Sequence, residues 1–221
     1  MNLVILGAPG AGKGTQAFYL ARHYGIAHIS TGNMFRACVR DGLPLGKEIE
    51  DLLRRGQLVP DSITVDMVTE RVKAPDAAKG FVMDGFPRTT EQAGTWERSG
   101  RPIDLVLDLH VSDDLIVERV SGRVFCPNCG ATFHKTYRRP KEKGLCDICG
   151  GELLQRDDDK DQTVIERLRL YHELTDPIKD FYRTLHKAFL TIDGVGESAL
   201  ITGRIVQALV DHDMTYSPAE G

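Results

Sequence analysis

The sequence predicts an α/β fold built around a parallel β-sheet. Five short apolar segments have the length and composition of buried strands, and stretches with helical character separate them. These strand candidates are Leu3–Leu6, Ala27–Ser30, Phe81–Met83, Leu105–Leu109 and Phe189–Ile192. A glycine-rich turn follows the first strand and leads into a helix expected from Lys13 to about His23. This alternation is typical of sheets in which a helix connects each strand to the next parallel one.

Two segments interrupt the alternation and are predicted to be insertions into the core. Residues 30–59 are polar and helical, and glycines interrupt this segment at several points. Residues 122–159 hold four of the five cysteines and end in a charged run. Such a shift in composition marks a subdomain inserted into a larger fold. The core is then expected to comprise residues 1–29, 60–121 and 160–221.

Composition and charge narrow the class of protein. A hydrophobic content of 41% and a charged content of 27% in 221 residues are ordinary for a globular protein. The net charge of −4 gives no electrostatic reason to expect a nucleic-acid partner. The apolar start Met1–Leu6 is too short for a signal peptide, and no run has the length of a membrane span. We therefore expect a cytoplasmic protein with neither a nucleic-acid nor a membrane partner.

A phosphate-binding loop is predicted at the end of the first strand. The strand, a glycine-rich turn and a helix start together direct backbone N–H groups at an anion, and Lys13 supplies a point charge. The residues expected around the phosphates are Gly10, Ala11, Gly12, Lys13, Gly14 and Thr15. The usual hydroxyl after the lysine is replaced by Gly14, which predicts a Mg²⁺ held mainly by nucleotide and water. The alternative is a tight βα turn without a ligand.

A second candidate site begins where the third strand ends, at Asp84. An apolar strand that ends in a carboxylate is typical of phosphate-loop enzymes that position Mg²⁺, although many such residues only cap a helix. Arg88 follows four residues later. It should reach the same sheet edge as Lys13, where open α/β sheets bind their ligands.

The paired cysteines predict a structural metal site. Cys126, Cys129, Cys146 and Cys149 form two C-x-x-C pairs separated by sixteen residues. This spacing is a strong signature of four-thiolate zinc, and four protein ligands leave no open position for catalysis. Iron on the same ligands is the alternative. Metal thiolates also fit a reducing compartment.

Several motifs closely resemble those of the nucleoside monophosphate kinases, and of the adenylate kinases with a long, zinc-containing lid in particular. The matching segments are Gly7–Thr15, Ser30–Arg36, Asp84–Thr89 with Gln92, Gly122-Arg123, Arg156 and Arg167. They occur in the family's order and cover nearly the whole chain. The resemblance implies a five-stranded core with strand order 2-3-1-4-5, an AMP-binding arm at residues 30–59 and a lid at residues 122–159.

The resemblance also implies the activity, a reversible and Mg²⁺-dependent transfer between ATP and AMP that gives two ADP, performed by a monomer. The residues implied for AMP are Thr31, Arg36, Gln57, Leu58, Val59, Gly85, Phe86, Pro87, Arg88, Gln92, Arg156 and Arg167. Those implied for ATP, besides the phosphate loop, are Arg119, Arg123, Thr132, Phe133 and Gly196. The implied catalytic set is Lys13, Asp84, Arg88, Arg123, Arg156 and Arg167.

One residue departs from the family pattern. Asn33 stands where the family usually has an aspartate that helps to order the waters around Mg²⁺. Arg40, which lies outside the motif, is predicted to be a solvated charge.

Two other functions remain open at this point. One is a kinase for UMP or CMP, because base specificity is the least determined part of the site. The other is a zinc-ribbon module that binds nucleic acid. This second function leaves the phosphate loop and the arginines unexplained, and the ribbon carries no evident stacking face.

Overall fold

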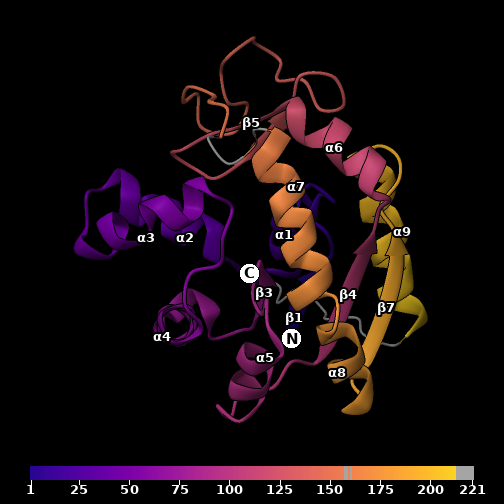
Figure 1. Cartoon of the computed structure of the whole chain (residues 1–221). Helices are drawn as coiled ribbons and strands as arrows, with labels where there is room; N and C mark the ends of the chain where they lie inside the picture. Colours follow the sequence, from indigo (N-terminus) through magenta and orange to yellow (C-terminus); the bar gives the residue numbers. More distant parts are fainter. Residues whose placement is uncertain (157–158, 160, 213–221) are drawn as a thin grey trace.

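The computed structural model places a five-stranded parallel β-sheet at the centre of the fold (Figure 1). The structure describes residues 1–156, 159 and 161–212. Part of the charged run that ends the expected lid, and the last residues of the expected core, therefore lie outside the described residues. The strands are β1 (Asn2–Leu6), β2 (Ala27–Ser30), β3 (Phe81–Asp84), β4 (Leu105–His110) and β7 (Ala188–Asp193). Their order, β2-β3-β1-β4-β7, confirms the predicted 2-3-1-4-5 arrangement, since β7 is the fifth strand of this sheet.

Helices connect the strands and cover both faces of the sheet (Figure 1). From the N-terminus to the first cysteine pair they are α1 (Lys13–Tyr24), α2 (Thr31–Arg40), α3 (Pro44–Arg54), α4 (Asp61–Arg71), the 3₁₀ turn η1 (Pro75–Ala77), α5 (Thr90–Glu97) and α6 (Asp113–Ser121). After the second pair they are α7 (Asp161–Leu170), the π-helical turn η3 (Tyr171–Thr175), α8 (Ile178–Thr184) and α9 (Ser198–Asp211). None of the described helices is long and apolar enough to cross a membrane.

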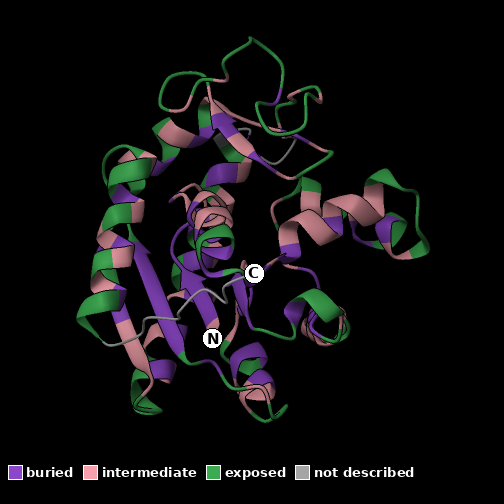
Figure 2. Ribbon diagram, turned by 180° about the vertical axis from the view of Figure 1, so that it is seen from behind, coloured by how far each residue is buried: buried purple, intermediate pink, exposed green. Residues whose placement is uncertain are grey.

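The alternation of side chains along β1 explains why both faces are covered. Leu3 and Ile5 pack into an apolar cluster on the side of α1 and α9, whereas Val4 and Leu6 pack into a second cluster with α4, α5 and α8. A strand buried on both faces must be apolar throughout, and the strands of parallel sheets therefore occur in the sequence as continuous apolar runs. Figure 2 shows the buried strands at the centre and the exposed residues on the outer sides of the helices.

Each inserted segment has only a small apolar cluster of its own. Helices α2 and α3 enclose Phe35, Ile49 and Val59. The two-stranded sheet β5 (Arg123–Phe125) and β6 (Thr132–His134) encloses Phe133 together with Ala131 and two of the cysteines. Clusters of this size stabilise a segment weakly, so the second insert needs a further source of stability.

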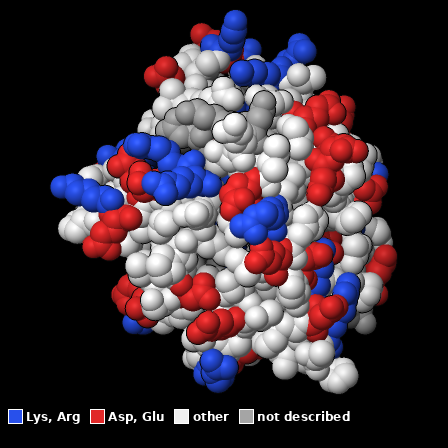
Figure 3. Space-filling model, in the orientation of Figure 1, with Lys and Arg blue, Asp and Glu red and all other residues white. Residues whose placement is uncertain are grey.

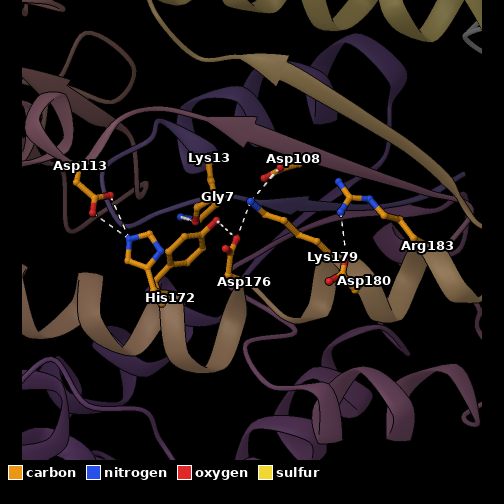
Figure 4. A network of polar contacts seen from close by, with 10 residues as sticks. Gly7, Lys13, Asp108, Asp113, His172, Asp176, Lys179, Asp180 and Arg183 are labelled. Atoms are coloured by element: carbon orange, nitrogen blue, oxygen red, sulfur yellow. Dashed lines mark hydrogen bonds and ion pairs between the residues drawn. The ribbon is translucent and has the colours of Figure 1, made fainter.

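A buried ion pair joins β4 to the helical segment that follows α7 (Figure 4). Asp108 is 3% exposed in the middle of β4, and Lys179 Nζ lies 3.0 Å from its Oδ2. The same ammonium group lies 2.7 Å from Asp176 Oδ1, which also accepts a hydrogen bond from the Tyr171 hydroxyl at 3.3 Å. The lysine therefore holds the turn between η3 and α8 against the sheet.

We expect Lys179→Met to lower the free energy of unfolding by about 3 kcal/mol, because it leaves the Asp108 carboxylate buried without its cation. Denaturant unfolding would measure the loss. The matched control is Lys73→Met, since Lys73 pairs with Glu70 at the exposed C-terminal end of α4 and its loss should cost less than about 1 kcal/mol. Adding Asp108→Asn to Lys179→Met should restore part of the stability. Equal losses from the two lysine variants would contradict this role.

Candidate active site

A cavity of about 480 Å³ opens at the carboxyl ends of the strands and gathers most of the predicted site residues. Its lining includes Gly10 to Thr15 of the loop, Arg36, Asp84, Gly85, Arg88, Arg119, Arg123, Thr132, Phe133, Arg156, Arg167 and Gly196. These residues come from the core and from both inserted segments. The cavity is therefore complete only when the three parts of the chain lie together.

The phosphate loop lines the floor of this cavity. Helix α1 begins at Lys13, and the Lys13 ammonium group donates to the carbonyl oxygens of Gly7 and Ala8, each at 2.8 Å (Figure 4). Burial, together with the positive charges of nearby arginines, lowers the pKa of Lys13 to about 7, although the Asp84 carboxylate acts in the opposite direction. The ammonium group is thus placed to bind a phosphate, and the protein alone neutralises its positive charge only in part.

Asp84 lies beside the loop at the end of β3. Its Oδ2 accepts a hydrogen bond from Ser30 Oγ at 3.2 Å, and the Nε2 of His28 lies 4.0 Å away. Burial raises the pKa of the Asp84 carboxyl, but nearby cations, Lys13 foremost, outweigh burial and hold that pKa below its usual range. A charged carboxylate at this point can bind the waters of a hydrated Mg²⁺.

The same carboxylate explains the unusual glycine after the lysine. A Cβ atom at Gly14 would lie 3.0 Å from Asp84 Oδ2, closer than nearly all such contacts. A serine or threonine at this position would need the carboxylate to move away. The hydroxyl of the usual phosphate-loop pattern has been replaced by a close approach of Asp84 to the helix backbone.

A second buried carboxylate, Asp159, holds two of the predicted arginines. Arg123 makes a two-point contact with both carboxylate oxygens of Asp159, and Arg167 Nη1 lies 3.5 Å from Oδ1. The Asp159 side chain has no exposed surface. Paired N–H donors of an arginine match phosphate oxygens as well as they match a carboxylate, so these two groups are already shaped for an anion.

Two further arginines share one aromatic ring. The guanidinium carbon of Arg156 lies 5.0 Å from the centroid of Phe125, and that of Arg36 lies 5.8 Å from the same centroid. The negative face of an aromatic ring attracts such cations. Phe125 therefore lowers the cost of bringing an arginine of α2 next to an arginine at the end of the cysteine-containing segment.

A smaller cavity adjoins the first and contains the residues predicted on the AMP side. Its lining includes Thr31, Arg36, Gln57, Leu58, Val59, Gly85, Arg88, Gln92 and Arg167. The Thr31 hydroxyl and Arg88 Nε both donate to the Gly85 carbonyl oxygen at 2.8 Å, which fixes the turn after β3. Pro87 lines a neighbouring pocket, but the Phe86 ring packs on Trp96 in the core. Phe86 is therefore a core residue and lines neither cavity.

The inserted segments touch each other above the cavity. Asn33 Oδ1 accepts a hydrogen bond from Arg36 Nη2 at 2.7 Å, and its Nδ2 lies against Gly130, where a Cβ would be 2.6 Å away. Arg40 Nη1 donates to the Pro127 carbonyl oxygen at 2.6 Å. Arg40 is exposed, as expected for a solvated charge, and this hydrogen bond also joins α2 to the first cysteine turn.

The four cysteines form a site that fits zinc. Their sulfur atoms all lie within 4.8 Å of one another, and the Cys126–Cys149 and Cys129–Cys146 pairs are 3.4 and 3.6 Å apart. A tetrahedral ion with bonds of about 2.3 Å spaces its sulfurs about 3.8 Å apart, close to these values. The backbone N–H of Ile148 donates to Cys146 Sγ, as expected around a thiolate.

The charges on the outer surface are arranged differently from those in the cavity. Acidic and basic side chains are interspersed on the face drawn in Figure 3, and the net charge of the chain is −4. The cavity lining, in contrast, includes Lys13 and seven arginines. This concentration of cations serves a ligand that enters the molecule rather than one that lies on its surface.

The fold and the site together define a phosphate-loop nucleotide-binding protein of the α/β class, with cations for several phosphate groups at the carboxyl edge of its sheet. The family model for adenylate kinase matches residues 5–187, and this chain belongs to the adenylate kinase family. It is 48% identical over 214 residues to an adenylate kinase of Caldicellulosiruptor saccharolyticus, covering 95% of this chain and 99% of that one. An adenylate kinase of Streptomyces avermitilis is 46% identical over 218 residues, covering 96% and 99%.

Sequence reasoning missed several residues that support the site. Asp159 and Phe125 contact predicted arginines, and Asp61 accepts a hydrogen bond from Gln92 Nε2, but no motif includes these three residues. The only signal for Asp159 was the charged run at the end of the cysteine segment. Contacts of this kind join positions far apart in the chain, so a single sequence cannot reveal them.

We expect binding of a polyphosphate ligand to take up protons at pH 8. Lys13 has a pKa of about 7 without ligand, so it is mostly neutral at pH 8, and a bound phosphate should raise this pKa and protonate it. Affinity should therefore fall as pH rises above 7. Calorimetry with a nucleoside triphosphate in buffers of different ionisation enthalpy would measure the uptake, which Lys13→Met should remove. Identical proton uptake in both proteins would show that Lys13 does not titrate.

Proposed function

We propose that this protein is an adenylate kinase that transfers the terminal phosphoryl group of ATP to AMP and forms two ADP. The observation that carries this proposal is the convergence of the phosphate loop, Arg88 and the lid arginines on one cavity, with the pocket of Thr31 and Gln92 beside it. The relatives named adenylate kinase, matched over nearly their full length, support it. A coupled assay of ADP formation with AMP, GMP, UMP and CMP tests it. A preference for UMP or CMP would overturn the adenine assignment.

The chemistry needs alignment and charge stabilisation more than it needs proton transfer. The AMP phosphate is mostly dianionic at neutral pH, because its second pKa is about 6, and it can attack without a general base. Lys13, Arg88 and the arginines 36, 123, 156 and 167 line the space where the phosphates of both nucleotides would meet. Their fixed donors would stabilise the charge that spreads over the transferred group.

We further propose the division of labour among the three parts of the chain. Residues 30–59 would form the arm that binds AMP, residues 122–159 the lid over ATP, and the remaining residues the core. A site for the ATP adenine in the large cavity is supported by four residues that line it and do not line the smaller one: Arg119, Thr132, Phe133 and Gly196. Closure of both inserts would exclude water, which competes with AMP for the phosphoryl group.

Two metals are proposed, with separate roles. Magnesium would enter with the nucleotide, neutralise its phosphates and contact Asp84 through water. Zinc would be held by Cys126, Cys129, Cys146 and Cys149 and would stabilise the lid. We also propose that the enzyme works as a monomer in the cytoplasm and binds no nucleic acid. Thiolate ligands that need a reducing compartment support that location, and the enclosed position of the cations supports the absence of a nucleic-acid partner.

We expect Lys13→Met and Arg88→Ala each to lower kcat at least about 100-fold, because each removes a charge from a site where negative charge develops. Steady-state kinetics with ATP and AMP would measure this. Arg55→Ala is the matched control, since Arg55 is exposed at the C-terminal end of α3 and forms an ion pair there with Asp51. A raised KM with a normal kcat would mean that the group binds ground state and transition state equally.

Zinc removal should lower the melting temperature and leave much of the activity at temperatures well below it. The metal compensates for the small apolar cluster of the lid, and a preformed four-thiolate site does not persist in an unfolded chain. Magnesium removal should instead abolish turnover with little change in the melting point of the free enzyme. Metal analysis should find about one zinc per chain.

Cys146→Ser should reproduce the zinc-free protein, because a neutral hydroxyl replaces a thiolate poorly. Complete loss of activity at low temperature in a zinc-free enzyme whose lid is still folded would contradict the structural role.

A further inference from the structure

The amide of Gln92 is held in one orientation by two partners. Gln92 lies at the start of α5, is 1% exposed and lines the smaller cavity. Its Oε1 accepts a hydrogen bond from the backbone N–H of Arg88 at 2.8 Å. Its Nε2 donates to Asp61 Oδ1, in the first turn of α4, at 2.7 Å. Helices α4 and α5 pack against each other at this point (Figure 1).

Neither partner can reverse its role. A backbone N–H only donates and a carboxylate only accepts, so rotating the amide by half a turn would oppose donor to donor and acceptor to acceptor. The second oxygen of Asp61 is also engaged, because the Thr89 hydroxyl donates to Oδ2 at 2.7 Å. That hydroxyl in turn accepts from the backbone N–H of Gln92 at 3.1 Å, as the N-cap of α5. The amide orientation is thus connected to the starts of two helices.

One donor and one acceptor of the amide remain, and the fixed orientation determines which of the two lies at which position. A primary amide has two N–H donors and an oxygen with two lone pairs, so one N–H and one lone pair are left for the cavity. An adenine base presents a donating amino group at its 6-position beside an accepting ring nitrogen, which complements this pair. A hypoxanthine base presents an accepting oxygen beside a donating ring N–H. It would need the reversed amide.

We propose that Asp61 is a specificity-determining positioning residue, which selects a 6-aminopurine over a 6-oxopurine by fixing the orientation of the Gln92 amide. This inference rests on the proposed function, in which Gln92 faces the base of the acceptor nucleotide. Asp61 acts through Gln92 and makes no contact with the base. A site whose buried polar groups would be left unpaired by the wrong base discriminates strongly against it.

The test compares AMP with IMP, which differ only at the 6-position and the adjacent ring nitrogen. Asp61→Ala removes the acceptor, and water, which donates as readily as it accepts, can fill the space. The ratio of kcat/KM for AMP to kcat/KM for IMP should fall about tenfold, because one hydrogen bond to a charged group contributes about this much to the preference for one amide orientation. The loss should not be complete, because the Arg88 N–H still favours the native orientation. KM for ATP should stay unchanged. Asp61→Asn keeps one acceptor oxygen and should retain most of the discrimination.

Asp66→Ala is the matched control, because it removes the same charge from an exposed position of the same helix. General damage to the arm or to α4 would lower both activities together and leave the ratio unchanged. In a Gln92→Ala background, Asp61→Ala should not change the ratio further. An Asp61→Ala enzyme with the ratio of the wild type or of Asp66→Ala would overturn the proposal, and so would equal effects of Asp61→Ala with and without Gln92.

A measurement on the wild-type protein covers the case in which Asp61→Ala does not fold. The Gln92 side-chain N–H donated to Asp61 should exchange with solvent much more slowly in NMR than the side-chain amide of the exposed Gln57. Equal exchange would overturn the proposal. Failure of the proposed function is separate from these outcomes, because it would appear as a wild-type enzyme that forms no ADP from ATP and AMP.

Discussion

The repulsion among cations gathered in one cavity is the constraint on which the rest of the structure depends. Two like charges 4 Å apart repel by about 4 kcal/mol at an effective dielectric constant of 20, and this cavity is lined by Lys13 and seven arginines. Such a cluster forms without a ligand only if the protein supplies compensation. Asp84 provides it beside the phosphate loop, and Asp159 provides it where Arg123 and Arg167 meet. Phe125 adds an aromatic face between Arg36 and Arg156.

This compensation also explains why the cations come from separate parts of the chain. Helix α1 and the turn after β3 fix Lys13 and Arg88 at the sheet edge. The other arginines of the cavity lie on α2, α6, β5, α7 and the loops of the cysteine-containing segment, all outside the five-stranded sheet. A phosphate bound in place of the Asp159 carboxylate would offer the same guanidinium donors an equivalent partner. The ligand would then supply the negative charge that holds the three parts together.

The sequence predicted the sheet, its helices and most of the cavity lining because these features are local or periodic. The continuous apolar run of β1 and the glycines before Lys13 can be recognised without knowledge of distant residues. The fixed orientation of the Gln92 amide could not be predicted, because Asp61 and Gln92 are thirty-one positions apart and their pairing depends on how α4 packs on α5. The contact of Arg40 with Pro127 depends in the same way on the approach of two inserted segments. Spacing along a helix shows which face Arg40 occupies but not what meets that face.

The first cysteine turn connects the stability of the cysteine-containing segment with the geometry of the site. Its residues lie on two sides of the same loop: Cys126 and Cys129 face the other cysteine pair, while the Pro127 carbonyl and Gly130 face α2. Gly130 has a φ of +74° and leaves no room for a side chain beside Asn33, so the loop can approach α2 closely only with glycine here. The apolar cluster behind the loop is too small to fix this backbone with the accuracy that a hydrogen bond requires. Four cysteine ligands on a single ion would fix it directly. The proposed zinc would therefore shape the surface that faces α2 without contacting the substrate.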